Sequence, residues 1–325
     1  MNAHSFAVLR LLADGAFHSG EALAQRLDLS RASIWQALQG VEAAGVELYS
    51  VRGRGYRLAA PIDWLDGQRI AEAQGASAAR FHVELHDEID STNTLLMQRA
   101  AVGAAHGTVI AAERQTAGRG RLGRRWQGEL GGSLMFSLLW RFPFGVAQLS
   151  GLSLAVGLAI VQALEQLGVQ GAGLKWPNDV LYQGRKLAGV LIEVQGDALG
   201  PSCAVIGIGI NCRLSAATQA TIDQTVTDLA QAGMGAVPRN RLLAAVLGEL
   251  AVVLARFERD GFAGLLGDWQ ARHLFHRREV DLLAPSGLRR AVAVLGVDAD
   301  GALLVDGGAG VETVRVGELS LRAKS

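Results

Sequence analysis

The sequence predicts an α+β protein of three domains, and three patterns support this prediction. Residues 1–62 show helical periodicity followed by a short hairpin, residues 63–272 alternate between strands and helices, and residues 273–325 switch to the period of two that is typical of strands. At 325 residues the chain is also too long for one ordinary hydrophobic core. We therefore expect an N-terminal winged helix-turn-helix, a central sheet packed with helices, and a small C-terminal β-barrel or sandwich.

Shorter patterns predict single elements of these domains. Residues 61–67 are expected to form the linker after the first domain, and the apolar segment 149–167 a helix buried under the sheet. Residues 223–269 have a helical pattern, and the C-terminal strands are expected to turn at residues 285–287, 300–301 and 307–308. The core stripe of the helical pattern is Leu242, Leu243, Val246, Leu250 and Leu254.

The first 62 residues have the order of elements found in a winged helix-turn-helix. Apolar positions predict helices near residues 6–12, over 21–27 and over 31–44, with Ser19 and Ser30 as N-caps, and glycines 53 and 55 mark a hairpin turn. In such a unit the third helix and the hairpin face DNA. The candidate DNA-binding residues there are Ser30, Arg31, Ser33, Gln36, Arg52 and Arg54, and Arg57 is also expected to face phosphates. A helical bundle used for packing or dimerisation is the alternative.

The overall charge restricts how this protein can meet its partners. Half of the residues are apolar, 19% are charged and the net charge is zero, so any DNA contact must come from a local patch. The two cysteines, Cys203 and Cys212, suit neither a disulfide framework nor a metal site. We recognise no signal peptide and no apolar run of about 20 residues that could span a membrane, and we expect a cytoplasmic protein.

The segment from Glu113 to Trp126 is the most unusual stretch of the chain. It reads ERQTAGRGRLGRRW and contains five arginines, three glycines and no apolar periodicity. Arginine can bind phosphate and carboxylate through paired hydrogen bonds, and glycine lets the backbone approach such an anion closely. We therefore expect a loop that is mobile until it folds over an anionic ligand, and a solvated surface loop is the alternative.

Three further features of the central region indicate a ligand site. Lysine occurs only at positions 175, 186 and 324, and Lys175 and Lys186 lie close together in a chain that otherwise uses arginine, which favours a chemical role over a chance pair of surface lysines. Ser91, Thr92 and Asn93 supply more polar groups than the N-cap of one helix requires. The glycines at positions 207 and 209 alternate in a strand, which indicates that a ligand or another backbone approaches that face closely.

Three motifs together resemble the biotin protein ligases of the bifunctional bacterial type. They are AGRGRLGRRW at 117–126, KWPNDV at 175–180 with RKLAGVLIE at 185–193, and GIGIN at 207–211, and the resemblance runs over essentially the whole chain. It implies a central sheet like that of class II synthetases and an SH3-like C-terminal domain. It also implies two activities: ATP-dependent biotinylation, and biotin-responsive repression of the biotin synthesis operon through the N-terminal domain.

The resemblance implies a reaction in two steps. The carboxylate of biotin attacks the α-phosphorus of Mg-ATP and gives biotinyl-5′-AMP, which is also the corepressor. The acyl group then passes to one lysine of the biotin carboxyl carrier protein of acetyl-CoA carboxylase. The barrier of the first step is electrostatic because two anions must meet, so cations beside the phosphoryl group are expected to contribute most to the rate.

The resemblance also assigns roles to individual residues. Lys186 is expected to bridge the carboxylate and the α-phosphate, Lys175 to add charge nearby, and Arg119 and Arg121 to close over the intermediate. The expected biotin contacts are Ser91, Thr92, Asn93, Gln115, Arg119, Gly120, Arg121 and Lys186, and the expected nucleotide contacts are Arg121, Trp126, Asn178, Asp179 and Asn211. No protein ligand of Mg²⁺ is assigned.

Two stretches depart from the pattern of this family. Leu122 stands where the loop usually has another arginine, and Trp35, Gln36 and Ala37 replace what is usually a more polar and basic surface on the third helix. A homodimer is expected through Gly189–Val194, because this stretch lacks the charges that usually protect an edge strand. Two other functions stay open: a lipoate-type ligase, and a biotin-sensing transcription factor without ligase turnover.

Overall fold

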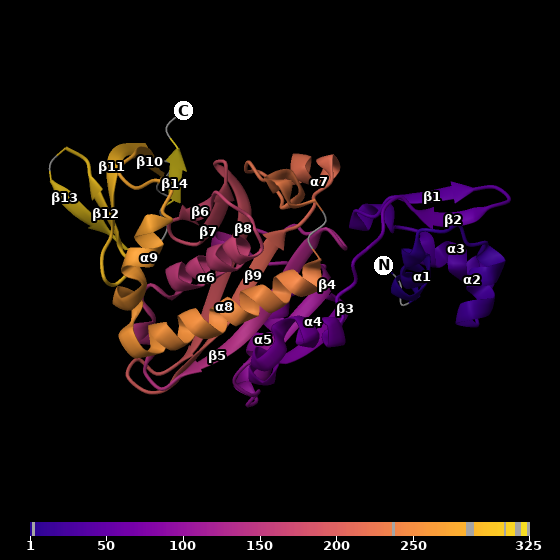
Figure 1. Cartoon of the computed structure of the whole chain (residues 1–325), viewed down its shortest axis with the longest axis horizontal. Coiled ribbons are helices and arrows are strands. Elements are labelled where there is room, and N and C mark those ends of the chain that lie inside the picture. The colour runs from indigo at the N-terminus through magenta and orange to yellow at the C-terminus, as the bar shows by residue number, and fades with distance from the viewer. Residues whose placement is uncertain (2–3, 236–237, 284–288, 309, 316–319, 324–325) are drawn as a thin grey trace.

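The computed structural model describes residues 1, 4–235, 238–283, 289–308, 310–315 and 320–323 of the chain (Figure 1). The N-terminal helical unit and the C-terminal sheet lie at opposite ends of a larger central part, which contains a seven-stranded sheet. The helices and strands therefore form an α+β fold, as predicted.

The N-terminal unit contains three short helices and a hairpin. The helices are α1 (Ser5–Leu11), α2 (Gly20–Leu27) and α3 (Arg31–Leu38), and the hairpin pairs β1 (Leu48–Val51) with β2 (Gly55–Leu58). The Ser19 and Ser30 hydroxyls accept hydrogen bonds from the first turns of α2 and α3, so both predicted N-caps are confirmed. The order of elements is that of a winged helix-turn-helix.

The third helix is shorter than predicted, and one of its side chains points the other way. It ends at Leu38 instead of near Ala44, because Gln39 is extended and Gly40 has a φ of 78°, and a separate turn follows over Glu42–Ala44. Ala37 is fully buried, so it belongs to the core of this unit and not to the surface that meets DNA. Of the three residues that depart from the family pattern here, only Trp35 and Gln36 are exposed.

The central sheet is mixed and has the strand order β3-β4-β5-β9-β8-β7-β6. Its first pair, β3 (His82–Ile89) and β4 (Thr108–Gln115), is parallel, and all other neighbours are antiparallel. The remaining strands are β5 (Ser133–Phe142), β6 (Ala172–Lys175), β7 (Asp179–Tyr182), β8 (Arg185–Gly196) and β9 (Ser202–Asn211).

Helices cover both faces of this sheet because its strands alternate apolar side chains between the two faces. Ile110, Leu139 and Val205 pack in one cluster with α5 (Thr92–Ala101). The neighbouring residues Val109, Leu138 and Ile206 belong to the main core with α6 (Leu152–Gln166) and α8 (Arg239–Asp260). Residue alternation therefore places α5 on one face and the two long helices on the other.

The long helices agree with the predicted apolar segments, with two corrections. The stripe of α8 predicted as structural core, Leu242, Leu243, Val246, Leu250 and Leu254, is fully buried. The apolar helix α6 begins at Leu152 instead of Leu149, after Gly151 with a φ of 80°. The helical segment predicted from Asp223 is wrong at its start, since α8 begins only at Arg239. No helix in the described parts of the chain is long and apolar enough to cross a membrane.

Shorter helices connect these elements. They are α4 (Gly67–Gln74), α7 (Ala216–Thr221) and α9 (Leu266–Ala271). The C-terminal part is a five-stranded antiparallel sheet in the order β13-β12-β11-β10-β14. Its strands are β10 (Glu279–Leu283), β11 (Arg289–Val297), β12 (Leu303–Asp306), β13 (Val311–Val314) and β14 (Ser320–Ala323).

The turns of the C-terminal sheet follow the predicted glycines where they can be seen. A turn closes at Gly301, whose N–H donates to Asp298 O at 3.0 Å, and Gly307 and Gly308 lie between β12 and β13. The turn predicted at residues 285–287 lies outside the described residues. Trp176 Nε1 donates to Gly301 O at 3.0 Å, which joins this sheet to the KWPNDV segment. The SH3-like topology and the exact domain boundaries stay predictions.

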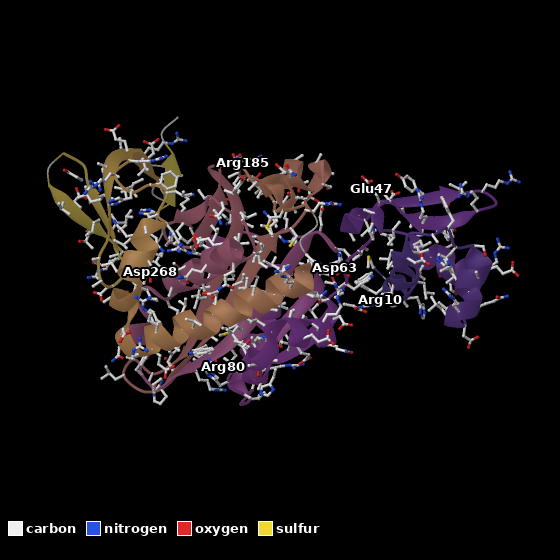
Figure 2. The ribbon with its side chains drawn as sticks, viewed as in Figure 1. Arg10, Glu47, Asp63, Arg80, Arg185 and Asp268 are labelled. Atoms are coloured by element: carbon white, nitrogen blue, oxygen red, sulfur yellow. The ribbon has the colours of Figure 1, made fainter. Side chains whose placement is uncertain are left out.

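The predicted linker at 61–67 is bound tightly to the central part. Arg239, which is 1% exposed, donates from Nε to Asp63 O at 3.0 Å and from Nη2 to Glu113 Oε2 at 2.7 Å. Leu65 N donates to the other oxygen of Glu113 at 2.7 Å. Nearby, Arg10 of α1 forms a paired ion contact with Asp87, and Figure 2 shows Arg10 and Asp63 at this junction. Glu113 therefore belongs to the core and does not balance the arginines of the following loop.

Candidate active site

The predicted biotin-contacting residues line one pocket, which lies beside the end of β4 and over β8 and β9. The empty space between its walls is about 470 Å³, part of it open to solvent. Polar groups come from the start of α5 and from the Arg/Gly loop, which we define as residues 117–126, and apolar groups come from the sheet. The lining residues are Ser91, Thr92, Asn93, Gln115, Arg119, Gly120, Arg121, Trp126, Phe136, Asn178, Lys186, Gly189, Val190, Leu191, Gly207, Ile208 and Gly209.

The polar end of this pocket is a hydrogen-bonded cluster at the N-terminus of α5. Ser91 caps the helix, so its hydroxyl is used for structure as well as for lining the pocket. Thr92 N donates to Gln115 Oε1 at 2.7 Å, and the buried Ser137 Oγ lies 2.7 Å from Thr92 Oγ1 and 2.5 Å from Asn93 Oδ1. These contacts fix donors and acceptors in one orientation before a ligand arrives. The prediction missed Ser137, because a single serine in an apolar strand gives no signal.

The two glycines of β9 explain how the pocket floor is made. A Cβ atom on Gly207 would lie 2.2 Å from Asn93 Oδ1, and one on Gly209 would lie 2.3 Å from Trp126 Cε2. Neither distance is possible for a real side chain, so each glycine is required by a close approach to this face. The predicted neighbour was a ligand or another backbone. The atoms that come close are side chains of the pocket itself, and not another backbone.

The arginines of the loop have partners on β8 and beside β7. Arg119 makes a paired ion contact with Glu193, with distances of 2.9 and 3.0 Å, and Asn93 Nδ2 also donates to Glu193 at 3.0 Å. Arg121 Nη1 donates to Asn178 Oδ1 at 3.0 Å. Burial lowers the pKa of the Arg121 guanidinium, and the nearby Asp179 carboxylate partly opposes this effect. Glu193 was not predicted as a site residue, although it ends the RKLAGVLIE motif.

A second and larger pocket opens from the first. Its empty volume is about 1750 Å³, and the two pockets share Gly120, Arg121, Trp126, Asn178 and Lys186. It is also lined by Leu122, Arg124, Arg125, Gln127, Lys175, Trp176, Pro177, Asp179, Asn211, Ile222, Asp223, Gln224 and Val226. All the predicted nucleotide contacts thus line this second pocket.

The ammonium group of Lys186 lies at the junction of the two pockets. Its Nζ is 2.7 Å from Asp179 Oδ1 and 5.8 Å from the centre of the Trp126 ring. Lys175 Nζ lies 3.8 Å from the other oxygen of Asp179. The side chains of Lys186, Asp179 and Lys175 are 15%, 14% and 19% exposed, so their charges interact in a partly water-free site.

The chain segment after β9 forms the far wall of the second pocket. Lys186 N donates to Thr225 O at 3.0 Å and Thr227 N donates to Lys186 O at 2.9 Å, so this segment runs beside the main chain of the lysine. Asn211 Nδ2 donates to Thr227 O at 3.0 Å, which fastens the same segment. The sequence did not predict this wall, because residues 223 onward were expected to form a helix.

The resemblance implies that Mg²⁺ binds together with ATP, and the residues present fit this ion. Mg²⁺ usually binds one or two carboxylates together with phosphate oxygens and water. Asp179 and Asp223 are two carboxylates that line the second pocket. Within the described ranges, no group of three or more histidine, cysteine or acidic residues is placed to hold a metal without such phosphates.

The candidate DNA-binding residues lie on α3 and on the hairpin. Ser30, Arg31, Gln36, Arg52 and Arg54 are exposed, whereas Ser33 is half-buried and its hydroxyl lies 2.8 Å from that of Ser30. Trp35 is 56% exposed on the same helix. The guanidinium of Arg57 is half-buried and lies 4.8 Å from the Phe17 ring and 5.1 Å from the Tyr49 ring, and that of Arg54 lies 4.2 Å from the Phe17 ring. That these arginines face phosphates stays a prediction.

Taken together, a winged helix-turn-helix joined to two connected pockets on a mixed sheet defines a class: a small-molecule-binding protein with a helix-turn-helix domain of its own. Comparison with known proteins agrees. Residues 85–211 match the Biotin/lipoate A/B protein ligase family, and residues 4–57 match the HTH domain family.

Individual relatives extend this likeness over the whole chain. The bifunctional ligase/repressor BirA of Escherichia coli is 37% identical over 97% of this chain and 96% of its own length. The biotin ligase of acetyl-CoA carboxylase from Mycobacterium tuberculosis is 35% identical over 81% of this chain and 97% of its own length. A solved biotin protein ligase of Aquifex aeolicus, in complex with biotin and ATP, has a TM-score of 0.64 and 30% identity, and the match covers 75% of this chain and 99% of that one. The chain belongs to the family of bifunctional ligase/repressor BirA proteins.

Proposed function

We propose that this protein attaches biotin to a lysine of the biotin carboxyl carrier protein of acetyl-CoA carboxylase, and that it represses the biotin synthesis operon when biotinyl-5′-AMP is bound. The observation that carries the proposal is the shape of the site. A small pocket with a polar end meets a larger cationic pocket, and Lys186 and Arg121 line both. An acid and a nucleotide that must react with each other would meet at such a junction.

In the first step, the residues of this chain hold two anions together. The ureido group of biotin is placed against Ser91, Thr92, Asn93 and Gln115, which directs its carboxylate toward Lys186. The positive charges of Lys186 and Arg121 offset the repulsion between this carboxylate and the α-phosphate, and Lys175 adds a third charge nearby. Magnesium, when bound, neutralises charge on the phosphates of ATP.

Asp179 positions the lysine in this step. Its carboxylate lies between the two lysines, at 2.7 Å from Lys186 Nζ and 3.8 Å from Lys175 Nζ. It therefore holds both ammonium groups at the junction in the absence of phosphates. Trp126 offers an indole face beside Lys186, and Asn178 and Asn211 complete the proposed nucleotide site.

In the second step, the loop protects the intermediate until the carrier protein arrives. Biotinyl-5′-AMP is a mixed anhydride that water or stray amines would consume. Arg119, anchored to Glu193, and Arg121, anchored to Asn178, hold the loop across the first pocket. The ε-amine of the acceptor lysine then attacks the acyl carbon, and AMP leaves.

The homodimer is proposed to form through β8. Its partner β7 pairs with residues 185–189 only, while β9 pairs along the other side as far as Gly196. Residues 191–196 therefore have an open edge among the described residues, and Val194 is 40% exposed there. Glu193 was overlooked in the prediction that this edge is uncharged, but its carboxylate is occupied by Arg119. Because the carrier protein must reach the same side of the site, we propose that it competes with the second subunit.

A pyrophosphate-release assay with biotin, ATP and a biotin carrier domain tests the enzymatic part. Turnover of biotin, with lipoate inactive, supports the proposal. Binding of biotin without turnover would instead make the protein a sensor, and turnover of lipoate would make it a lipoate-type ligase. Lys186→Gln is expected to reduce the first step at least about a hundredfold, as the loss of a buried charge at the reacting group does. Arg185→Gln is the control, since this neighbouring arginine contacts Gln231 and lines neither pocket (Figure 2).

Binding of operator DNA tests the repressor part. We expect affinity to rise when biotin and ATP are both added and to fall with increasing salt, because Arg31, Arg52 and Arg54 contact phosphates. An affinity that does not respond to biotin and ATP would contradict the proposed repressor function.

A further inference from the structure

A buried carboxylate lies at the point where the DNA-binding unit, the Arg/Gly loop and the second pocket meet. Glu129 is 5% exposed, and no cation forms an ion pair with it among the described residues. Both of its carboxylate oxygens lie 3.0 Å from Ser215 N, and Ser215 Oγ also donates to Oε1. A buried carboxyl group without hydrogen-bond partners is costly, and in the described part of the chain the hydrogen bonds of this carboxylate go to Ser215.

What Glu129 holds is the start of α7. Ser215 is the N-cap of this helix and accepts a hydrogen bond from Thr218 N at 3.1 Å. The other end of α7 is held from the same turn, because Thr221 Oγ1 donates to Gln127 Oε1 at 2.6 Å. Residues 127–129 therefore fasten α7 at both of its ends.

The chain that leaves α7 enters the second pocket directly. Ile222, Asp223, Gln224 and Val226 line that pocket, and residues 225–227 then pair with the main chain of Lys186. The position of α7 therefore determines the position of the pocket wall.

The same turn is packed into the N-terminal unit. Leu130 is 4% exposed and lies in the hydrophobic core of that unit, and its N–H donates to Ala44 O at 3.3 Å. A Cβ atom on Gly45 would lie 2.8 Å from Cγ of Glu129, so the side chain of Glu129 packs directly against the backbone of Gly45. Figure 1 shows α7 on the side of the central part that faces the N-terminal hairpin, and Glu47 and Thr218 line one groove between them.

We propose that Glu129 is a positioning residue for the nucleotide: it fixes α7, and through α7 the wall formed by residues 222–226, to the turn that also anchors the DNA-binding unit. This inference rests on the proposed function, since it assigns the second pocket to ATP. Glu129 contacts neither pocket, and it acts through Ser215.

Kinetics of Glu129→Ala, Ser215→Ala and the double variant test this proposal in the full-length protein. We expect KM for ATP to rise about tenfold in Glu129→Ala, the size of effect expected for a lost hydrogen bond to a charged group. The affinity for biotin measured without nucleotide, and kcat at saturating ATP, are expected to stay within about twofold of wild type. The double variant is expected to resemble Glu129→Ala, because the two residues act through one contact.

Asp66→Ala is the matched control. This carboxylate also caps a helix, accepting from Arg69 N at the start of α4, but it lines neither pocket. Ser215→Ala removes only one hydroxyl, so it carries the test if Glu129→Ala does not fold.

An unchanged KM for ATP in both single variants would overturn the proposal. So would an equal loss in biotin affinity, in KM for ATP and in kcat together with a lower melting temperature. Additive effects in the double variant would also overturn it. Failure of the wild-type protein to turn over biotin and ATP is a separate result, which contradicts the proposed function instead.

Discussion

The buried imidazole of His273 makes the stability of this protein depend on pH in a way that can be worked out. This side chain is 6% exposed, its ring stacks on Trp269 at 4.5 Å between centroids, and neither ring nitrogen has a hydrogen-bond partner. Burial lowers its pKa from 6.5 to about 4, and the nearby His276 adds to this effect. The folded protein therefore keeps His273 neutral where the unfolded chain would protonate it.

The sign and size of the effect follow from linkage. Between pH 6.5 and pH 4 the unfolded chain binds more protons at this residue, so the free energy of unfolding falls as the pH falls through this range. A shift of 2.5 units corresponds to about 3.4 kcal/mol at the limit, and to about 2.5 kcal/mol at pH 4.5. Above pH 6.5 the contribution is complete and constant.

Urea unfolding of wild type and of His273→Gln at several pH values between 7.5 and 4.5 measures this effect. The variant lacks the contact between the rings of His273 and Trp269 at every pH. This loss cancels because the measured quantity is the change in the free energy of unfolding with pH within each protein. We expect the free energy of unfolding of wild type to fall by about 2.5 kcal/mol more than that of the variant. If the free energy of unfolding changes with pH equally in the two proteins, the argument that burial of His273 lowers stability in acid is refuted.

Three further predictions concern the active site and the dimer. Arg121→Gly is expected to release free adenylate and to label bystander lysines, measured as biotin on added albumin; no increase over wild type would contradict the role of the loop. Gly207→Ala places a methyl group 2.2 Å from Asn93 Oδ1, so KM for biotin is expected to rise at least about tenfold, while Gly248→Ala, in open space on α8, leaves it unchanged. Val194→Lys is expected to weaken dimerisation in the presence of biotin and ATP, measured by sedimentation, without loss of ligase activity. Val252→Lys, at an exposed position of α8, is the control, and equal dimerisation in both variants would contradict the proposed interface.

Local signals in the sequence predicted the parts of the site that depend on neighbouring residues. Ser19, Ser30 and Ser91 cap helices where a polar residue precedes an apolar period. The alternating glycines of β9 indicated a close approach, because glycine weakens a strand and often marks a place where another group needs the space of a side chain. The roles given to Lys186 and the loop arginines came from motif resemblance, and the structure brings these residues to one junction.

Contacts between distant segments could not be predicted in this way. Glu113 looked like a member of the arginine loop, but its partner Arg239 lies 126 positions later. Glu193, Ser137 and Glu129 likewise acquire their roles from partners in other elements. Ala37 was predicted to lie on the DNA-facing surface because it follows Trp35 and Gln36 in the sequence. The helical repeat instead points its side chain into the core.

The anchored segment at Asp63 and Leu65 has a consequence for how operator DNA is read. A flexible linker would let each DNA-binding domain reach its half-site independently. Here the linker is fixed to the central part, because Arg239 donates to Asp63 O and Leu65 N donates to Glu113. In a dimer joined through β8, the separation of the two recognition helices is then a property of the protein. Inserting half a helical turn of base pairs between the half-sites is therefore expected to abolish tight binding, although every contacted base is still present.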